Sequence, residues 1–316
     1  MRNSRSGALR VVFSVIFVVA AGVILYKTVF NTSHQTITAT TQSEDIHETK
    51  VDISDKSYDQ YSFEDLKYIA SQLKDATGEQ RSQIAQAYHL IDEAGNLNPQ
   101  TLSVRLNDGR TLEFRLAGIC QDEGSGLTFI TNAYPDKHEM NPSSVKDGGW
   151  KSCSMRSWLQ EDVYANLPQD MQNALVAVNK TTNAGDAQGG ARYNASGSLQ
   201  TTQDTLWLPS ASEVCGTIDW FTKDDVFDNS KLNANMSGQG NQYQIFSEHG
   251  IQSKKDPEGF LTTFNKGKGG WWYRSPYAFS YDFMDSSFWY SVMDSGFPFA
   301  YFHPQDQMAC VFGFCI

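Results

Sequence analysis

The residues with the greatest capacity for chemistry are five cysteines, and they are spread along the chain. They are Cys120, Cys153, Cys215, Cys310 and Cys315. A structural zinc site needs ligands in close pairs, such as Cys-x-x-Cys, and neither the cysteines nor the six histidines show that spacing. An odd number of cysteines also leaves at least one thiol unpaired where disulfides form. The pattern therefore predicts no metal site and no cofactor.

Catalytic groups are equally sparse. Cys310 and Cys315 could supply a nucleophile or a redox pair, but residues five apart on a strand face opposite sides of a sheet. No nucleophile has a recognisable ordered base, and no pair of carboxylates stands out. The acidic residues within 224–228 and 282–285 are too few for the oxygen cage that calcium requires. We therefore expect a protein that is not an enzyme.

Aromatic recognition is the remaining chemistry, and it is concentrated near the C-terminus. Residues 271–316 hold 16 of the 40 aromatic residues, together with one arginine and four aspartates. Between residues 277 and 302 the aromatics alternate with Ser, Gly and Asp, a composition typical of binding loops. The alternative is that these rings pack as core. The predicted binding residues are Trp272, Arg274, Tyr277, Tyr281, Trp289, Tyr290, Phe299 and Tyr301.

Two features within this segment leave alternatives open. Arg274 would hold an acidic group of a ligand, or it would form a buried ion pair or cation–π contact that braces the domain. Trp271 and Trp272 are adjacent, so on a strand they point to opposite faces. We expect one of them in the core and the other at a loop or a ligand, since exposed aromatics suit sugars and protein partners.

Local patterns predict the elements that position these residues in the first half of the chain. Ser62 with Asp65 forms a capping box before residues with helical apolar spacing, and a helical hairpin is predicted over residues 62–94. Residues 102–106 and 112–116 alternate apolar with polar on either side of Asn107-Asp108-Gly109, which predicts a β-hairpin. Residues 127–130 supply a further strand.

The second half predicts short elements joined by long loops. Helices are expected at about residues 154–164, after Pro168, and after a second capping box formed by Ser210 and Glu213. Residues 205–208 and 260–264 are predicted to be strands, whereas residues 183–203 show no period and are predicted to be irregular. The whole pattern indicates an α+β domain whose loops carry the function.

The N-terminus predicts export and membrane attachment. Three arginines precede an apolar run over residues 11–30, whose uncharged part would span roughly 24 Å as a helix. The basic flank favours a cytoplasmic N-terminus. A cleaved signal peptide near Ala20 is the alternative, but apolar residues continue past that point. The predicted parts are residues 1–10 as a cytoplasmic tail, 11–30 as a single-pass transmembrane signal anchor, 31–59 as a disordered stalk, 60–98 as the helical hairpin and 99–316 as an extracellular domain.

The exported part is acidic. Once the four basic residues of the first thirty are set aside, 21 basic residues face 36 acidic ones, a formal charge of −15. Such a surface repels phosphate backbones, because it releases no counterions from them. We therefore expect no nucleic-acid partner.

Several short motifs follow one another in a fixed order. They are Gly148-Gly149-Trp150, Met155-Arg156-Ser157-Trp158-Leu159, Leu206-Trp207-Leu208-Pro209-Ser210, Trp271-Trp272-Tyr273-Arg274-Ser275-Pro276 and Gly313-Phe314-Cys315-Ile316. The ordered set resembles an uncharacterised bacterial domain-of-unknown-function family with a Trp-Trp-x-Arg-Ser-Pro signature, found in surface proteins of Gram-positive gut actinobacteria. The resemblance covers residues 60–316.

This resemblance implies a C-type-lectin-like fold, which is shared with formylglycine-generating enzymes. It also suggests two disulfides, Cys215–Cys315 between motif segments and Cys120–Cys153, with Cys310 left free. Related sequences carry an arginine or a proline near the end, and residues 310–316 here lack both. No ligand role is therefore transferred to the closing motif.

Together these observations predict a membrane-anchored extracellular binding module that recognises a glycan or a protein through its C-terminal aromatic loops. Two alternatives remain. One is an enzyme related to the formylglycine-generating branch, which would need a reactive Cys310 or Cys315. The other is a structural module of the cell envelope.

Overall fold

The structure of the protein is a computed structural model, and it describes residues 53, 55–185, 198–220, 230–277 and 287–316. The predicted cytoplasmic tail, the predicted anchor and most of the predicted stalk lie outside these residues, as does Tyr281. Within them, no helix combines the length and the apolar character needed to cross a bilayer. Residues 52–316 form one compact unit, and its buried apolar residues make a continuous core.

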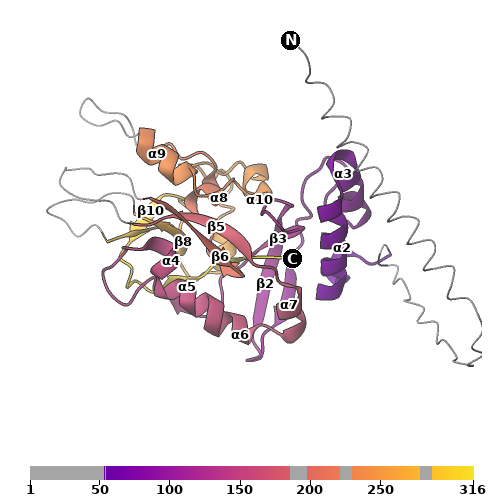
Figure 1. Cartoon of the computed structure of the whole chain (residues 1–316), viewed down its shortest axis with the longest axis horizontal. Coiled ribbons are helices and arrows are strands. Elements are labelled where there is room, and N and C mark those ends of the chain that lie inside the picture. The colour runs from indigo at the N-terminus through magenta and orange to yellow at the C-terminus, as the bar shows by residue number, and fades with distance from the viewer. Residues whose placement is uncertain (1–52, 54, 186–197, 221–229, 278–286) are drawn as a thin grey trace, which may run out of the picture. The chain divides into compact units, whose positions relative to one another are not determined.

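Two helices, α2 (Phe63–Asp75) and α3 (Gly78–Ala87), form the predicted helical hairpin. The predicted capping box begins α2, because the Ser62 hydroxyl accepts the Asp65 N–H and the Asp65 carboxylate accepts the Ser62 N–H. The apolar face of α2 packs on a sheet, where Phe63 stacks on Phe114 with ring centroids 6.1 Å apart. Helix α2 lies beside β2 and β3 (Figure 1). The hairpin and the following domain therefore share one core.

The folded unit begins before the predicted boundary at residue 60. Ile53 and Tyr58 are buried in the core, and a short 3-10 turn, η1 (Tyr58–Gln60), precedes α2. The prediction that residues 31–59 form only a disordered stalk is therefore wrong at its end. Two isolated apolar residues in a polar stretch show no periodicity, so their burial left no local signal.

The first sheet contains the predicted β-hairpin and the last strand of the chain. Its strands, in spatial order, are β1 (Leu102–Arg105), β2 (Thr111–Ile119), β3 (Leu127–Thr131), β12 (Gly313–Cys315) and β7 (Leu206–Trp207). All neighbours are antiparallel, and β12 lies between β3 and β7. The closing motif is therefore a central strand, in which Phe314 packs on Phe129 and Phe114.

The second sheet holds the aromatic C-terminal region. Its strands, in spatial order, are β10 (Ala300–Phe302), β9 (Trp289–Val292), β8 (Trp271–Pro276), β11 (Met308–Ala309) and β4 (Lys137–His138). Trp271 and Trp272 are both fully buried. The expectation that one of them faces a loop or a ligand is therefore wrong. Strand β8 has covered faces on both sides: Trp271 packs against Phe264, while the Trp272 indole donates to the carbonyl of His138 at 3.0 Å.

A two-stranded ribbon and short helices complete the unit. Strands β5 (Val178–Asn183) and β6 (Leu199–Asp204) pair in antiparallel register, so part of the segment predicted to be irregular is a strand. The helices after α3 are α4 (Gly149–Ser152), α5 (Ser154–Trp158), the π-helical turn η2 (Leu159–Val163), α6 (Tyr164–Asn166), α7 (Gln169–Ala174), α8 (Ala211–Cys215), α9 (Ser230–Ser237), α10 (Gln244–Glu248) and α11 (Thr262–Asn265). The predicted α+β class with short strands is confirmed (Figure 1).

One predicted strand is a helical turn instead. Helix α11 occupies most of the segment predicted to be a strand over residues 260–264. Asp256 orders the chain just before α11, because its carboxylate accepts the backbone N–H groups of Phe260 and Leu261 at 2.8 and 3.0 Å. These bonds shape the turn that leads into α11, whose own N-cap residue, Leu261, has no side-chain cap.

Candidate functional site

A polar groove lies beside α8 and α10, and we call it the main groove. Its volume is about 540 Å³. A second hollow of about 400 Å³, the side groove, shares Lys254 and Lys255 with it and ends at Gly296 and Phe297. The main groove is lined by Cys215, Thr217, Asp219, Gln242, Ser247, Gly250, Ile251, Gln252, Ser253, Lys254 and Lys255. The two hollows are therefore neighbours, and together we call them the depression.

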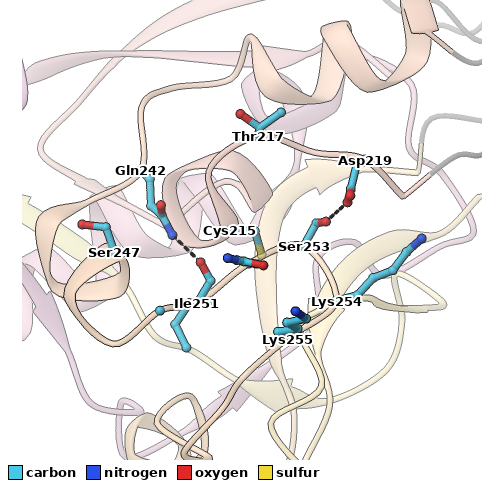
Figure 2. A pocket seen from close by; sticks show the side chains of 11 residues that line it. Cys215, Thr217, Asp219, Gln242, Ser247, Ile251, Ser253, Lys254 and Lys255 are labelled. Atoms are coloured by element: carbon cyan, nitrogen blue, oxygen red, sulfur yellow. Dashed lines mark hydrogen bonds between the residues drawn. The ribbon is translucent and has the colours of Figure 1, made fainter.

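Gln242 fixes the wall of the main groove. Its side-chain amide donates to the carbonyl of Val214 on α8 and to the carbonyl of Ile251, both at 2.8 Å. Figure 2 shows the second of these bonds. Gly216 ends α8 with a φ of 72°, and a Cβ there would lie 2.8 Å from the Gln242 amide oxygen. A glycine is required at this position both for its backbone conformation and for space.

The opposite wall is held by Asp219 and Ser253. The Ser253 hydroxyl donates to the Asp219 carboxylate, and the two side chains point toward each other in Figure 2. The next residue, Trp220, donates its indole N–H to the carbonyl of Ser253 and stacks on Phe299 with centroids 4.2 Å apart. Phe299 in turn packs against Tyr290. The aromatic C-terminal region therefore supports this wall from behind.

The sequence-predicted binding residues divide into core and surface. Trp272, Tyr277, Trp289 and Tyr290 are buried, Phe299 is half-buried, and Tyr301 is 48% exposed. The predicted ligand contacts of the buried four are not available from solvent, because their side chains are at most 7% exposed. Tyr281 lies outside the described residues. Of the predicted set in the described part, Tyr301 is the exposed member.

Arg274 is a buried structural residue rather than a ligand contact. Its guanidinium donates to both oxygens of the Glu213 carboxylate, to the hydroxyl of Thr182 at 2.8 Å and to the carbonyl of Gln239 at 2.7 Å. The predicted ligand role is wrong for this conformation. The structure instead shows the alternative prediction, a buried ion pair, here between Arg274 and Glu213. Because Glu213 belongs to α8, the pair fixes the helix that forms one side of the main groove.

Lys180 extends this charged cluster through the interior. Its ammonium group binds Asp122 and Glu213 and donates to the Tyr243 hydroxyl at 2.6 Å. It also lies 3.9 Å from the centre of the Trp207 ring. Burial alone would raise the pKa of Glu213, but Arg274 and Lys180 outweigh it and lower the pKa to about 2. A carboxylate that stays ionised at neutral pH is unsuited to general acid–base work there.

A model of a known protein family matches the part of the chain that contains the grooves. A family model for a domain of unknown function, DUF6273, matches residues 125–298, which is more than half of the chain. The chain belongs to the DUF6273 family. This confirms the predicted membership of an uncharacterised domain family. The matched part of the DUF6273 protein includes both grooves and the Trp-Trp-x-Arg-Ser-Pro segment. No curated protein and no solved structure matches the chain.

The thiols of this DUF6273 protein are free, and four of the five are buried. Cys215 contacts the Tyr273 hydroxyl at 3.6 Å, whereas Cys315 contacts Thr128 and Asp122. The suggested disulfides Cys215–Cys315 and Cys120–Cys153 are therefore not formed. Burial raises the pKa of Cys153, Cys215 and Cys315 to about 12, and it raises the pKa of Cys310 as well. These thiols are protonated at neutral pH, so they lack the thiolate that a nucleophile requires.

The grooves of this DUF6273 protein were not predicted from the sequence. Residues 217–257 contain polar loops with short apolar pieces, and nothing periodic marks them. One signal was present: Lys254 and Lys255 are consecutive in a chain whose net charge is −11. In the part of the chain that the structure describes, no group of three or more His, Cys, Asp or Glu residues is arranged to hold a metal ion.

Proposed function

We propose that this protein is a surface binding module that holds a glycan in the depression formed by the two adjacent grooves. The observation that carries the proposal is the combination of fixed polar groups with an exposed ring at one end. Asp219, Gln242 and Ser253 are held by internal hydrogen bonds, and Phe297 is 39% exposed beside Gly296. A volume of about 540 Å³ lies within the range of small-ligand sites.

Sugars combine hydroxyl groups with apolar C–H faces, so they need both kinds of contact. The polar walls of the main groove offer carboxylate, amide and hydroxyl groups to sugar hydroxyls. Phe297 at the end of the side groove offers an apolar ring face. Rigid walls reduce the ordering cost of binding. These features favour recognition over catalysis.

The placement of the protein and its fold family belong to the same proposal. The apolar run over residues 11–30 and its basic flank support a single-pass anchor with the folded unit outside the cell. The tryptophan-rich closing region supports a C-type-lectin-like relationship. The burial of Cys310 and Cys315 speaks against the formylglycine-generating alternative. Exposed Met293, Phe297 and Tyr301 would also suit a protein partner, which the test below separates from a glycan.

A glycan array probed with the full chain tests the proposal. We expect the protein to bind one or more glycans on the array. Phe297→Ala should lower the affinity for them by roughly tenfold, the loss typical of a truncated aromatic anchor. Tyr68→Ala is the matched control, because Tyr68 is similarly exposed on α2. An empty array, or equal losses in the two variants, would refute a glycan site at the groove. Capture of a protein partner whose binding depends on Tyr301 would replace it with a protein-binding surface.

A further inference from the structure

Lys254 and Lys255 occupy the junction of the depression. They are the two residues that line both grooves, and both side chains are exposed. In Figure 2, Lys254 and Asp219 lie on one side of the main groove, and Gln242 and Ser247 lie on the other. A ligand that occupied both grooves would therefore contact these two lysines.

The backbone holds the two lysines in a fixed arrangement. The Gln252 N–H donates to the Lys255 carbonyl and the Lys255 N–H donates to the Gln252 carbonyl, both at 3.0 Å. Ser253 and Lys254 form the tip of this tight turn, and Ser253 is tied to Asp219 and Trp220. The backbone that carries the two lysines is thus a braced turn, so only their side chains need to be ordered on binding.

The acids beside the lysines are committed to other partners. The Asp219 carboxylate accepts the Ser253 hydroxyl, and the Asp256 carboxylate accepts the N–H groups of Phe260 and Leu261. Among the described residues, neither Lys254 nor Lys255 belongs to an ion pair. Glu258 is exposed nearby, but it does not line either groove. The junction therefore offers two ammonium groups that are free of ion pairs in the described part of the chain, next to the carboxylates of Asp219 and Asp256.

We propose that the depression selects an anionic glycan, whose acidic groups bind the ammonium groups of Lys254 and Lys255. This inference rests on the proposed glycan-binding function and names its ligand class. Ammonium groups form charge-assisted hydrogen bonds with carboxylate, sulfate or phosphate oxygens, and these bonds are stronger than neutral ones.

The net charge of −11 favours local contacts over long-range attraction in the choice of an anionic ligand. An acidic chain does not attract polyanions at long range, so any bound anion reports a local contact. At physiological salt the screening length is about 8 Å, which weakens the repulsion from distant acids more than it weakens contact with the two lysines. Acidic groups spaced along a sugar chain therefore suit the site better than a dense polyanion.

Binding of defined oligosaccharides to the full chain tests the inference. The probes are trigalacturonate, its neutral methyl ester, a chondroitin sulfate hexasaccharide, a glycerol-phosphate glycan fragment and neutral maltohexaose. We expect at least one acidic probe to bind more tightly than the neutral probes. The double variant Lys254→Gln/Lys255→Gln is expected to lower that affinity by about tenfold, which corresponds to losing one hydrogen bond to a charged group. Comparison of the acidic probes identifies the anion.

Matched variants keep the result interpretable. The double variant Lys67→Gln/Lys74→Gln removes the same charge from exposed positions on α2 and should leave the affinity unchanged. Lys254→Arg/Lys255→Arg should restore most of the binding, and thermal melting checks that every variant folds. Neutral probes that bind as well as acidic ones, or an unaffected Gln variant, would overturn the anionic site while leaving the glycan-binding function standing. If no probe binds and the glycan array is also empty, both proposals fall.

Discussion

The Arg274 guanidinium holds the Glu213 carboxylate through two hydrogen bonds in the protein interior, and both side chains are almost fully excluded from solvent. The pair joins strand β8 to helix α8, which forms one side of the main groove. A signature residue that looks suited to ligand recognition thus acts by placing the helix beside the groove. The structural importance of such a pair lies in the cost of breaking it.

Removal of one partner should be much more costly than removal of both. Arg274→Met leaves the Glu213 charge buried with Lys180 as its remaining cation, and we expect a loss of about 3–5 kcal/mol in unfolding free energy. The double variant Arg274→Met/Glu213→Leu should recover part of that loss. Chemical denaturation of the natural protein, Arg274→Met, Glu213→Leu and the double variant completes a double-mutant cycle. The cycle measures the coupling free energy between the two side chains.

Arg110 provides the surface control for this cycle. Its salt bridges to Asp108 and Asp136 are solvent-exposed, with the Arg110 side chain 42% accessible. Arg110→Met should therefore cost no more than about 1 kcal/mol. A cost for Arg274→Met that is no larger than this value would show that the buried pair contributes little.

Acid should weaken the folded state through Glu213. Its pKa is lowered from 4.5 to about 2 by the fold, so the folded state favours the ionised form. The resulting stability is fully present above pH 4.5 and is lost as the pH falls toward 2. Glu213→Gln removes this titration, so the variant should be less stable at neutral pH but lose less stability in the acidic window. Urea unfolding at several pH values gives both slopes, and parallel curves would contradict the assignment.

Local signals were enough to predict the elements that begin and end within a few residues. Two capping boxes and one turn form through hydrogen bonds between residues close in sequence, so they can be predicted from the sequence alone. They are Ser62–Asp65, Ser210–Glu213 and the turn at Asn107–Gly109. Strand β6 was missed because Leu199–Asp204 is mostly polar and owes its conformation to pairing with β5.

The candidate site depended on contacts between distant segments. The aromatic density near the C-terminus was correctly recognised as unusual, but the sequence did not say which rings face solvent. Burial of Trp272 and Trp289 follows from strands that join the sheet from elsewhere in the chain. The main groove arises where Gln242 links residue 214 to residue 251 and where Ser253 reaches Asp219. None of these pairs has a sequence spacing that a periodic pattern could reveal.

A methyl group added at Gly126, the residue just before strand β3, should displace helix α2. Gly126 faces the backbone of Ala70, and a Cβ there would lie 2.3 Å from the Ala70 carbonyl oxygen. Because backbone cannot rotate away, we expect Gly126→Ala to cost about 1–3 kcal/mol, as overpacking does in cores. At Gly238 the nearest atom is the flexible end of the exposed Leu199 side chain, so Gly238→Ala should stay within about 0.5 kcal/mol. Thermal unfolding compares the two, and a similar small effect at both sites would show that α2 adjusts freely.

The cysteines should behave as five free thiols of unequal accessibility. Cys120 is half-buried and the other four are buried, so a maleimide added to the folded protein should label Cys120 first. Burial raises the pKa of the Cys120 thiol, while Arg81 and Lys74 lower it, so labelling should be slow at neutral pH and faster as the pH rises. In denaturant without reductant, mass spectrometry should then find five adducts. Three adducts would indicate one disulfide and a single adduct would indicate two, and mapping of the linked peptides would then show whether the suggested pairing is present. Rapid native labelling at Cys310 or Cys315 would instead reopen the enzymatic alternative, because it requires a reactive thiol at one of those positions.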